Sequence, residues 1–456
     1  MQSQYDIRSF LKPGTHAHLV GIGGVSMRPL GLVLHSMGLT ITGSDMNSSV
    51  STEDLQSQGI PVAIGHRAQN IKGADCIIRT AAAHNDNPEI AAARAEGIPV
   101  FERAQAWGVI MQSYRNAICV SGTHGKTTTT SMLTHIFMEA GADPTVMIGG
   151  YLPLLKSGHR IGNGDTIVME SCEYCNSFLN FFPTTAVILN VDADHLDFFH
   201  SLDDIKSSFR KFAELVPADG LVVANRDDEN TMQTLHDYTG NLITFGLEAG
   251  ADVTAGPMSR GYSSFDVFCR GKHYTHLELK VIGRHNAYNA LAACAVAWKA
   301  GIPGDITAQA LASFRGAGRR LEYKGTYQGA DIYDDYAHHP SELHATLSAV
   351  ASMGYKRVIC AFQPHTYTRT KALFDDFLRE LRRADLAVLA EIYAAREQNT
   401  IGISSRDLAE KIDGAVYFET LPEVTAYLKS LAQPGDVILT VGAGDIYTVA
   451  DAIVKG

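Results

Sequence analysis

The residues best suited to chemistry form one short polar segment, Gly122-Thr123-His124-Gly125-Lys126-Thr127-Thr128. It follows the apolar run 117–120 and precedes an apolar-periodic stretch, which predicts a strand, a glycine-hinged loop and a helix start. Backbone N–H groups at such a helix N-terminus bind phosphate. Lys126 can reach the β/γ-phosphates of a nucleotide, and the Thr127 hydroxyl can ligate Mg²⁺. Although Val120 replaces the first glycine of a standard P-loop, we predict that the chain uses ATP.

Two further polar clusters follow predicted strands. Glu170 and Glu173 lie at the end of the run 166–170, where either carboxylate can bind Mg²⁺. The segment 190–197 follows the next apolar run and combines three aspartates with His195. Because open α/β sheets bind ligands at the carboxyl ends of their strands, both clusters are expected beside the phosphate loop. Solvated turn acids or a helix cap are the alternatives, but they account poorly for His195, for which we predict a metal or phosphate contact.

A glycine-rich turn near the N-terminus resembles a dinucleotide fingerprint. Gly21-Ile22-Gly23-Gly24 follows an apolar run, and Asp45 stands about 20 residues further on. This pattern suits a pyrophosphate at the turn and a ribose at the acid, but a tight turn without a ligand explains it equally well. A pyrophosphate is better supported than NAD, because nothing nearby indicates hydride chemistry.

The last third of the chain carries two more polar clusters. Residues 334–342 and 363–370 each follow a predicted strand, so they are expected to face one substrate site. Upstream, Asn286 and Asn289 are three residues apart on a predicted helix, and their amides suit an adenine edge. The alternative is that Asn286 only caps that helix.

Strand-like runs alternate with helical patterns throughout, which predicts an α/β protein with parallel sheets. A first block spans about 14–112, a second starts at the strand before Gly122 and ends with a β-rich stretch and a helix, and a third begins near Gly316. The predicted strands are 18–20, 40–43, 76–80, 166–170, 186–190, 221–225, 358–362, 386–390, 416–418 and 437–441.

Bulk composition narrows the class of protein. The net charge of −11 argues against binding to nucleic acid or an anionic membrane. We find no apolar run of the roughly 20 residues that span a bilayer and no signal-peptide pattern, so we expect a cytoplasmic protein. The seven cysteines are expected to be reduced, and the pair Cys172 and Cys175 lacks a second pair at zinc spacing.

Taken together, these segments resemble the Mur ligase family over the whole chain. The matching motifs are GIGG at 21–24, GTHGKTTTT at 122–130, DADHLD at 192–197, GRHNAYNA at 283–290, GRRLE at 318–322, DDYAHHPSE at 334–342, QPHTYTRT at 363–370, EIYAAREQ at 391–398 and GAGDI at 442–446. The combination of DDYAHHPSE with QPHTYTRT points to the muramate-directed branch of the family.

The resemblance implies three domains: a Rossmann-like UDP-binding domain at 1–112, a central P-loop ATPase domain at 113–316 and a Rossmann-like amino-acid-binding domain at 317–456. It implies that ATP phosphorylates the carboxylate of UDP-N-acetylmuramate and that the amino group of L-alanine attacks the acyl phosphate. The cofactors would be ATP and Mg²⁺, and the protein would be a monomer or homodimer that closes on its substrates.

The resemblance also implies roles for single residues. The implied catalytic residues are His124, Lys126, Glu173, His195, His338 and Arg369. The implied ATP-binding residues are Gly122, Thr123, Gly125, Lys126, Thr127, Thr128, His285, Asn286, Asn289 and Arg319. The implied metal ligands are Thr127, Glu173 and His195. The implied substrate-binding residues are Gly21, Gly23, Gly24, Asp45, His66 and Arg103 for UDP, and Tyr336, His338 and Arg369 for L-alanine.

The chain departs from the family pattern at several positions. Ser26 replaces a glycine of the UDP loop, and Cys172 replaces an acid between Glu170 and Glu173. Thr366 replaces a second arginine, which leaves Arg369 as the evident partner for a carboxylate. The alternatives are a ligase that attaches an intact tripeptide, a dinucleotide-dependent oxidoreductase, and a non-catalytic nucleotide-binding module.

Overall fold

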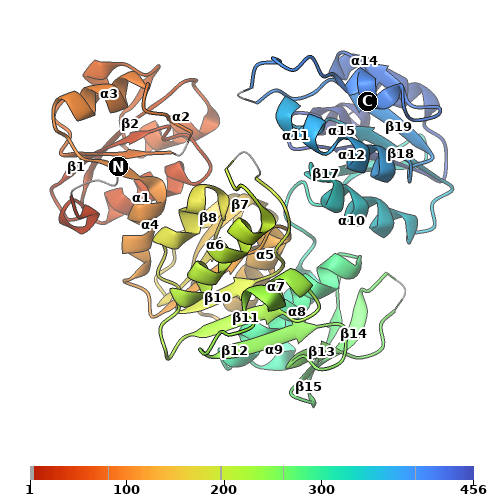
Figure 1. Cartoon of the computed structure of the whole chain (residues 1–456), viewed down its shortest axis with the longest axis horizontal. Coiled ribbons are helices and arrows are strands. Elements are labelled where there is room, and N and C mark those ends of the chain that lie inside the picture. Colours follow the sequence, from red (N-terminus) through yellow and green to blue (C-terminus); the bar gives the residue numbers. More distant parts are fainter. Residues whose placement is uncertain (1–4, 81, 196–197, 260, 396, 456) are drawn as a thin grey trace. The chain divides into compact units, whose positions relative to one another are not determined.

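The computed structural model describes residues 5–80, 82–195, 198–259, 261–395 and 397–455. Strands and helices alternate along it and build three sheets in sequence order (Figure 1). The chain divides into two compact units: Met1–Ala255 with Val267–Thr275 and Tyr288–Ala310, and Gly256–Asp266 with His276–Ala287 and Leu311–Gly456. No helix among the described residues has both the length and the apolar character to cross a bilayer.

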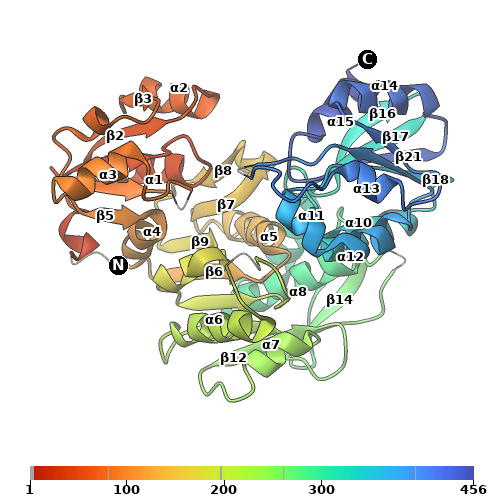
Figure 2. The same cartoon turned by 45° about the horizontal axis from the view of Figure 1, so that its top comes forward.

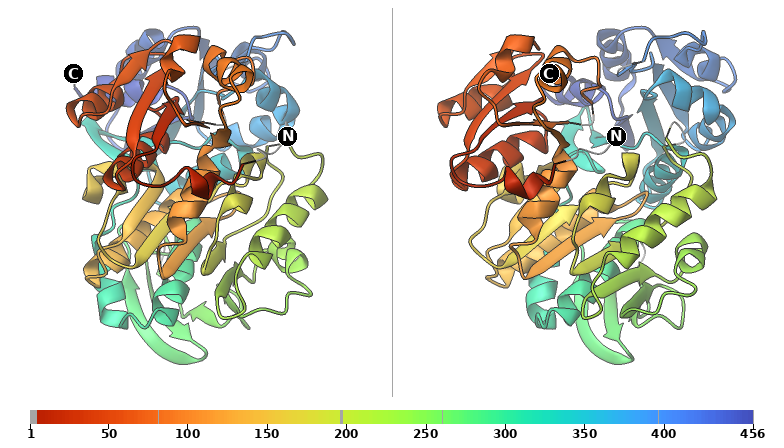
Figure 3. Two further views of the ribbon diagram at one scale, coloured as in Figure 1. Left: turned by 90° about the vertical axis from the view of Figure 1, so that its left-hand side faces the viewer. Right: turned by 60° about the vertical axis from the view of Figure 1, so that its left-hand side comes forward.

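The first sheet has the strand order β3-β2-β1-β4-β5, with parallel pairing between neighbours. Its strands are β1 (His16–Val20), β2 (Thr40–Asp45), β3 (Val62–Ile64), β4 (Cys76–Arg79) and β5 (Val100–Glu102). One face packs against α1 (Met27–Ser36), α2 (Val50–Ser57) and α4 (Arg103–Met111), and the other against η2 (Ala68–Ile71) and α3 (Pro88–Ala95) (Figure 3). The sequence predicted β1, β2 and β4, but not the three-residue strands β3 and β5.

The second sheet has the order β15-β14-β13-β12-β11-β10-β6-β9-β7-β8. Its strands are β6 (Asn116–Ser121), β7 (Thr145–Leu152), β8 (Ser157–Arg160), β9 (Thr166–Glu170), β10 (Thr185–Ile188), β11 (Leu221–Asn225), β12 (Leu242–Gly246), β13 (Val253–Ala255), β14 (Ser264–Cys269) and β15 (Lys272–Glu278). Pairing is parallel from β7 to β13, and β8 and β14 add antiparallel pairs. Because β6 lies between β10 and β9, the loop after β6 opens at the crevice where such sheets bind ligands.

Helices and short 3-10 turns surround this second sheet. They are α5 (Lys126–Glu139), η4 (Tyr174–Asn180), α6 (Leu202–Glu214), α7 (Glu229–Thr234), α8 (Arg284–Lys299) and α9 (Gly304–Ser313). Figure 2 shows α6 and α7 together along one side of the sheet, where Phe209 and Phe212 of α6 pack on its core. Helix α4 meets η4 at Gly108, where any side chain would collide with the carbonyl oxygen of Asn180.

The third sheet has the order β16-β17-β21-β18-β19-β20 and is parallel except for the pair β16–β17. Its strands are β16 (Glu322–Tyr327), β17 (Ala330–Asp335), β18 (Arg357–Phe362), β19 (Leu386–Ala390), β20 (Val416–Phe418) and β21 (Asp436–Val441). Helices α10 (Pro340–Ala351), α12 (Phe374–Leu381) and α13 (Ser405–Ala409) cover one face, and α14 (Leu421–Leu431) and α15 (Tyr447–Val454) the other. The short α11 (Tyr367–Ala372) follows β18.

The predicted α/β class with parallel sheets is confirmed. The strands predicted at 221–225, 386–390 and 416–418 have those bounds. Other predicted limits differ by one or two residues: β4 ends at Arg79, so Thr80 lies outside it. Asn190 was also placed in a strand, but β10 ends at Ile188 and Asn190 bonds the phosphate loop instead.

Candidate active site

The phosphate loop joins β6 to α5 and depends on two glycines with positive φ. Gly122 has φ 140° and Gly125, the residue before the helix, has φ 86°. A Cβ on Gly122 would lie 2.9 Å from Cβ of Leu189, and one on Gly125 would lie 2.5 Å from Oδ1 of Asn289. Both positions therefore need glycine for conformation and for space.

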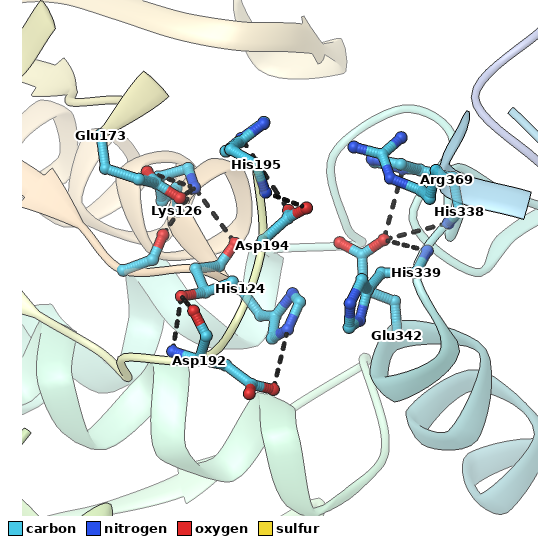
Figure 4. Close-up of polar contacts among 12 residues, drawn as sticks. His124, Lys126, Glu173, Asp192, Asp194, His195, His338, His339, Glu342 and Arg369 are labelled. Atoms are coloured by element: carbon cyan, nitrogen blue, oxygen red, sulfur yellow. Dashed lines mark hydrogen bonds and ion pairs between the residues drawn. The ribbon is translucent and has the colours of Figure 1, made fainter. Parts of the chain in front are cut away.

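Lys126 is the first residue of α5, and its ammonium group turns back over the loop (Figure 4). Nζ donates to the carbonyl oxygens of Gly122 at 2.5 Å and Thr123 at 3.1 Å, and it lies 3.0 Å from Oε2 of the buried Glu173. Burial disfavours the charge on Lys126, but the attraction of Glu173 and other nearby acidic groups outweighs it and raises the pKa of Lys126 above its ordinary value. The loop therefore carries a fixed positive charge.

The Thr127 hydroxyl bonds Glu170, whereas the resemblance implied Glu173 as the other ligand of its metal. Its Oγ1 donates to Oε1 of Glu170 at 3.1 Å, while Oε2 of Glu170 accepts the Gly149 N–H at 2.7 Å. Hydroxyl and carboxylate oxygens suit Mg²⁺, which usually keeps water and nucleotide phosphates as its other ligands. The donor set therefore fits Mg²⁺, although no three His, Cys, Asp or Glu side chains in the described segments form a metal site by themselves.

The loop after β10 is bonded to the phosphate loop through its backbone. Asn190 accepts the His124 N–H at 2.8 Å and donates to the His124 carbonyl oxygen at 3.0 Å. The Asp192 N–H donates to Oγ1 of Thr123 at 2.9 Å, and Oδ2 of Asp192 lies 3.8 Å from Nε2 of His124. These bonds place His124 between the two loops, beside Lys126.

His195 has an unusual backbone conformation, with φ 53°. Its N–H donates to Oδ1 of Asp194 at 2.7 Å, and its ring packs on Tyr174 with centroids 4.7 Å apart. Tyr174 directly follows Glu173, so the structure brings the Glu173 and His195 segments together, as the resemblance implied (Figure 4). Asp197 of the same motif lies outside the described residues.

The two asparagines that were expected to hold adenine both have protein partners. Oδ1 of Asn289 accepts from the Thr129 hydroxyl at 3.2 Å, which braces α5. Nδ2 of Asn286 donates to the carbonyl oxygen of Ile282 at 2.8 Å, across the start of α8. Their contact with adenine stays a prediction. Burial and the nearby charge of Arg320 lower the pKa of His285 to about 4.

In the third sheet, the motifs after β17 and β18 meet at the carboxyl edge, as predicted. The rings of His338 and His365 are 5.7 Å apart, and Nη1 of Arg369 lies 3.2 Å from Nδ1 of His365. Glu342 of α10 accepts the His338 N–H at 3.0 Å (Figure 4). Burial and the charges of His338 and Arg369 lower the pKa of His365 to about 4. The sequence motif contained His365 and Glu342, but we had assigned them no role.

The guanidinium of Arg319, which was predicted to contact a phosphate, makes several hydrogen bonds within its own unit. Nε donates to Asp334 at 3.0 Å, Nη1 to the Gly444 carbonyl oxygen at 3.0 Å, and Nη2 to that of Gly442 at 2.6 Å. Its guanidinium also lies 5.0 Å from the ring centroid of Tyr336. Arg319 therefore holds the 442–444 turn, and its contact with phosphate stays a prediction.

The N-terminal glycine turn follows β1 and is bonded to the end of β2. Gly21 has φ 78°, and Oδ2 of Asp45 accepts the Gly23 N–H at 2.9 Å. Ser26, which departs from the family pattern, bonds the guanidinium of Arg103 through its hydroxyl. The roles of these residues, of Gly24 and of His66 toward UDP stay predictions.

Replacing Gly125 with alanine is expected to lower kcat/KM for ATP about a hundredfold, because the new Cβ would displace Asn289 and the loop. Gly141, at the other end of α5, is a matched control: its φ is 72°, but a Cβ there meets nothing within 4 Å. Gly141→Ala would carry the same backbone strain without the collision. Steady-state kinetics that give equal losses for the two variants would contradict the steric explanation.

The low pKa of His285 predicts a dependence of stability on pH. Its folded pKa of about 4 lies below the ordinary 6.5, so the unfolded chain takes up the proton first as the pH falls. The stabilising contribution is complete above pH 6.5 and is lost between about 6.5 and 4. His285→Gln should therefore flatten the change in urea midpoint between pH 7 and pH 5, whereas exposed His236→Gln should leave it unaltered. Equal slopes for wild type and His285→Gln would contradict the burial of a neutral imidazole.

Comparison with known proteins defines the class. Family models match three successive segments: the Mur ligase family, catalytic domain, at 16–115; the Mur ligase middle domain at 120–297; and the Mur ligase, glutamate ligase domain, at 319–444. The chain therefore belongs to the Mur ligase family and has its three-domain α/β fold.

Comparison with individual proteins shows which members of the family this chain is similar to. The chain is 44% identical over 445 residues to the UDP-N-acetylmuramate–L-alanine ligase of Caldanaerobacter subterraneus, covering 96% of this chain and 97% of the relative. It is 45% identical to the protein of the same name from Acetivibrio thermocellus, with 96% of each covered. The crystal structure of UDP-N-acetylmuramate-alanine ligase from Thermotoga maritima matches with a TM-score of 0.81 and 31% identity, over 96% of this chain and 98% of that chain.

Proposed function

We propose that this protein ligates L-alanine to the carboxylate of UDP-N-acetylmuramate at the expense of ATP, with release of ADP and phosphate. The observation that carries the proposal is the Lys126–Glu173 pair at a shortened phosphate loop, in a chain that matches ligases of that name along almost its whole length. The match to these relatives favours a ligase over a dinucleotide-dependent oxidoreductase, the alternative that rested on the glycine turn at 21–24. The reaction is the first peptide step of peptidoglycan synthesis, and we expect it in the cytoplasm.

The ATP site supplies charge neutralisation. The ammonium of Lys126 is held by carbonyl oxygens and by Glu173, so the β- and γ-phosphates of ATP would meet a positive charge that is already in place. The proposed metal ligands are Thr127, Glu173 and His195. We add Glu170 to this set because its carboxylate accepts a hydrogen bond from the Thr127 hydroxyl. Bound Mg²⁺ would withdraw charge from the phosphates.

His124 is proposed to lie beside the transferring phosphoryl group. Its backbone is fixed on both sides by Asn190, and its ring lies near Asp192, so its position is set before the substrate binds. A hydrogen-bond donor that is already in position at this point stabilises the negative charge that develops when the muramoyl carboxylate attacks the γ-phosphate.

The third sheet is proposed to receive L-alanine. Arg369 provides a planar fork for the carboxylate of the amino acid. The His365 ring lies beside Arg369, and the His338 ring lies between those of His365 and Tyr336. The low pKa of His365 keeps that ring neutral at pH 7. A neutral imidazole beside Arg369 leaves the arginine as the cation that pairs with the carboxylate.

The segments 1–112, 113–316 and 317–456 are proposed as the UDP-binding, ATP-binding and amino-acid-binding domains, in a monomer or homodimer.

Phosphate release from ATP tests the activity: it should require UDP-N-acetylmuramate and L-alanine together. Release with an intact tripeptide but not with L-alanine would replace this proposal with the peptide-recycling ligase.

A further inference from the structure

Glu89 is a buried carboxylate in the first sheet's domain that the proposed chemistry does not use. It lies on α3 with no exposed surface. Its Oε2 accepts from the Ser44 hydroxyl at 2.6 Å and lies 3.2 Å from Nδ1 of His66, and its Oε1 accepts from Nδ2 of Asn70 at 2.6 Å. Burying a carboxylate without hydrogen-bond donors destabilises a protein. The donors gathered around Glu89 compensate its burial, and a buried acid that needs so many partners calls for a functional explanation.

The carboxylate of Glu89 is ionised at neutral pH. Burial disfavours its charge, but the His18 imidazole 3.7 Å away and hydrogen bonds from Ser44 and Asn70 outweigh burial and lower the pKa of Glu89 to about 2. An ionised carboxylate only accepts hydrogen bonds. The proton on the His66 ring therefore lies on Nδ1, which fixes the tautomer and leaves Nε2 for another partner.

The same cluster is continuous with the glycine turn. The Ser44 carbonyl oxygen accepts the N–H groups of Gly21 at 2.8 Å and Ile22 at 3.0 Å, and its neighbour Asp45 accepts the Gly23 N–H at 2.9 Å. The Asp45 carbonyl oxygen in turn accepts the N–H of Gly65, the residue before His66, at 2.7 Å. Ser44 and Asp45 thus join the turn at 21–23, the loop at 65–70 and Glu89 in one network.

We infer that Glu89 is a positioning residue for the UDP part of the nucleotide sugar: it orients His66 and, through Ser44, the glycine turn that would hold the diphosphate. This inference rests on the proposed function for the identity of the sugar nucleotide. Glutamine at position 89 has the same shape, but its amide would present donors to groups that already donate. The exchange should therefore disturb both loops without removing volume from the core.

The test compares Glu89→Gln with Glu96→Gln, an exposed glutamate at the end of the same helix. Titration calorimetry with UDP alone and with UDP-N-acetylmuramate should show binding weakened about tenfold or more by Glu89→Gln and unaltered by Glu96→Gln. The KM values for ATP and L-alanine should stay within about twofold of wild type, since their sites lie on other sheets. Unaltered UDP binding, or equal losses for all three substrates, would overturn the inference.

Two further variants separate positioning from folding. Asn70→Ala removes one donor to Glu89 and should weaken UDP binding in the same direction even if Glu89→Gln folds poorly. In a His66→Ala background, Glu89→Gln should weaken UDP binding less than it does in wild type, because only the route through Ser44 remains. Fully additive losses would contradict action through His66. Wild type that binds UDP but ligates no L-alanine would refute the proposed function and leave this inference standing.

Discussion

Replacement of Lys126 with alanine is expected to lower kcat for ATP-dependent ligation by about a thousandfold or more, because the variant removes the positive charge prepared for the γ-phosphate. Unlike a weakened substrate contact, this loss should appear mainly in kcat, since the charge on the transferring group grows toward the transition state. Phosphate release under saturating ATP, UDP-N-acetylmuramate and L-alanine measures it.

Loss of Lys126 also leaves the buried Glu173 without its cationic partner, which costs about 3–5 kcal/mol of stability. The double variant Lys126→Ala, Glu173→Gln separates the two effects: it should regain much of the stability but no activity. Lys211→Ala, an exposed position on α6, is the surface control. Turnover close to wild type in Lys126→Ala would refute the ATP-site assignment.

Replacement of Arg369 with alanine should raise the KM for L-alanine about a hundredfold, because the carboxylate of the amino acid would lose its bidentate partner. The KM for ATP and for UDP-N-acetylmuramate should change little. Thr366, three residues before Arg369, has a hydroxyl and no guanidinium, so it cannot compensate for the loss. Steady-state kinetics with each substrate varied in turn measure the three constants.

Two other arginine variants sharpen this expectation. Arg369→Lys keeps the charge but loses the planar fork, and we expect an intermediate rise in the KM for L-alanine. Arg379→Ala removes an exposed arginine that pairs with Asp376 and Glu380 of its own helix, and it should leave all three constants unaltered. A loss of kcat alone in Arg369→Ala would contradict a role in binding the amino acid.

Local features of the fold and site were predictable from the sequence. The phosphate loop follows from glycines next to an apolar strand and a helix start, because each of these signals lies within a few residues. The meeting of the His338 and His365 motifs follows from a general rule, since both come after parallel strands. The three-residue strands β3 and β5 were missed, although β20, which is equally short, was predicted.

Long-range pairings were not predictable. Glu170 and Glu173 looked equivalent in the sequence, yet one faces Thr127 and the other Lys126. The resemblance implied that Arg319 reaches a phosphate, and nothing local in the sequence shows that the 442–444 turn occupies its guanidinium. Glu89 was missed because a buried acid near a helix start looks like an ordinary first-turn residue. Only the tertiary structure shows its donors.

The central claim concerns which acceptor is joined to which amine, and mass analysis of the product tests it most directly. The protein would be given ATP, Mg²⁺ and UDP-N-acetylmuramate with a panel of single amino acids and an intact tripeptide. We predict a product heavier by one alanine residue, formed only when ATP is present and absent with Lys126→Ala. A product that carries the tripeptide, with none that carries alanine, would contradict the account.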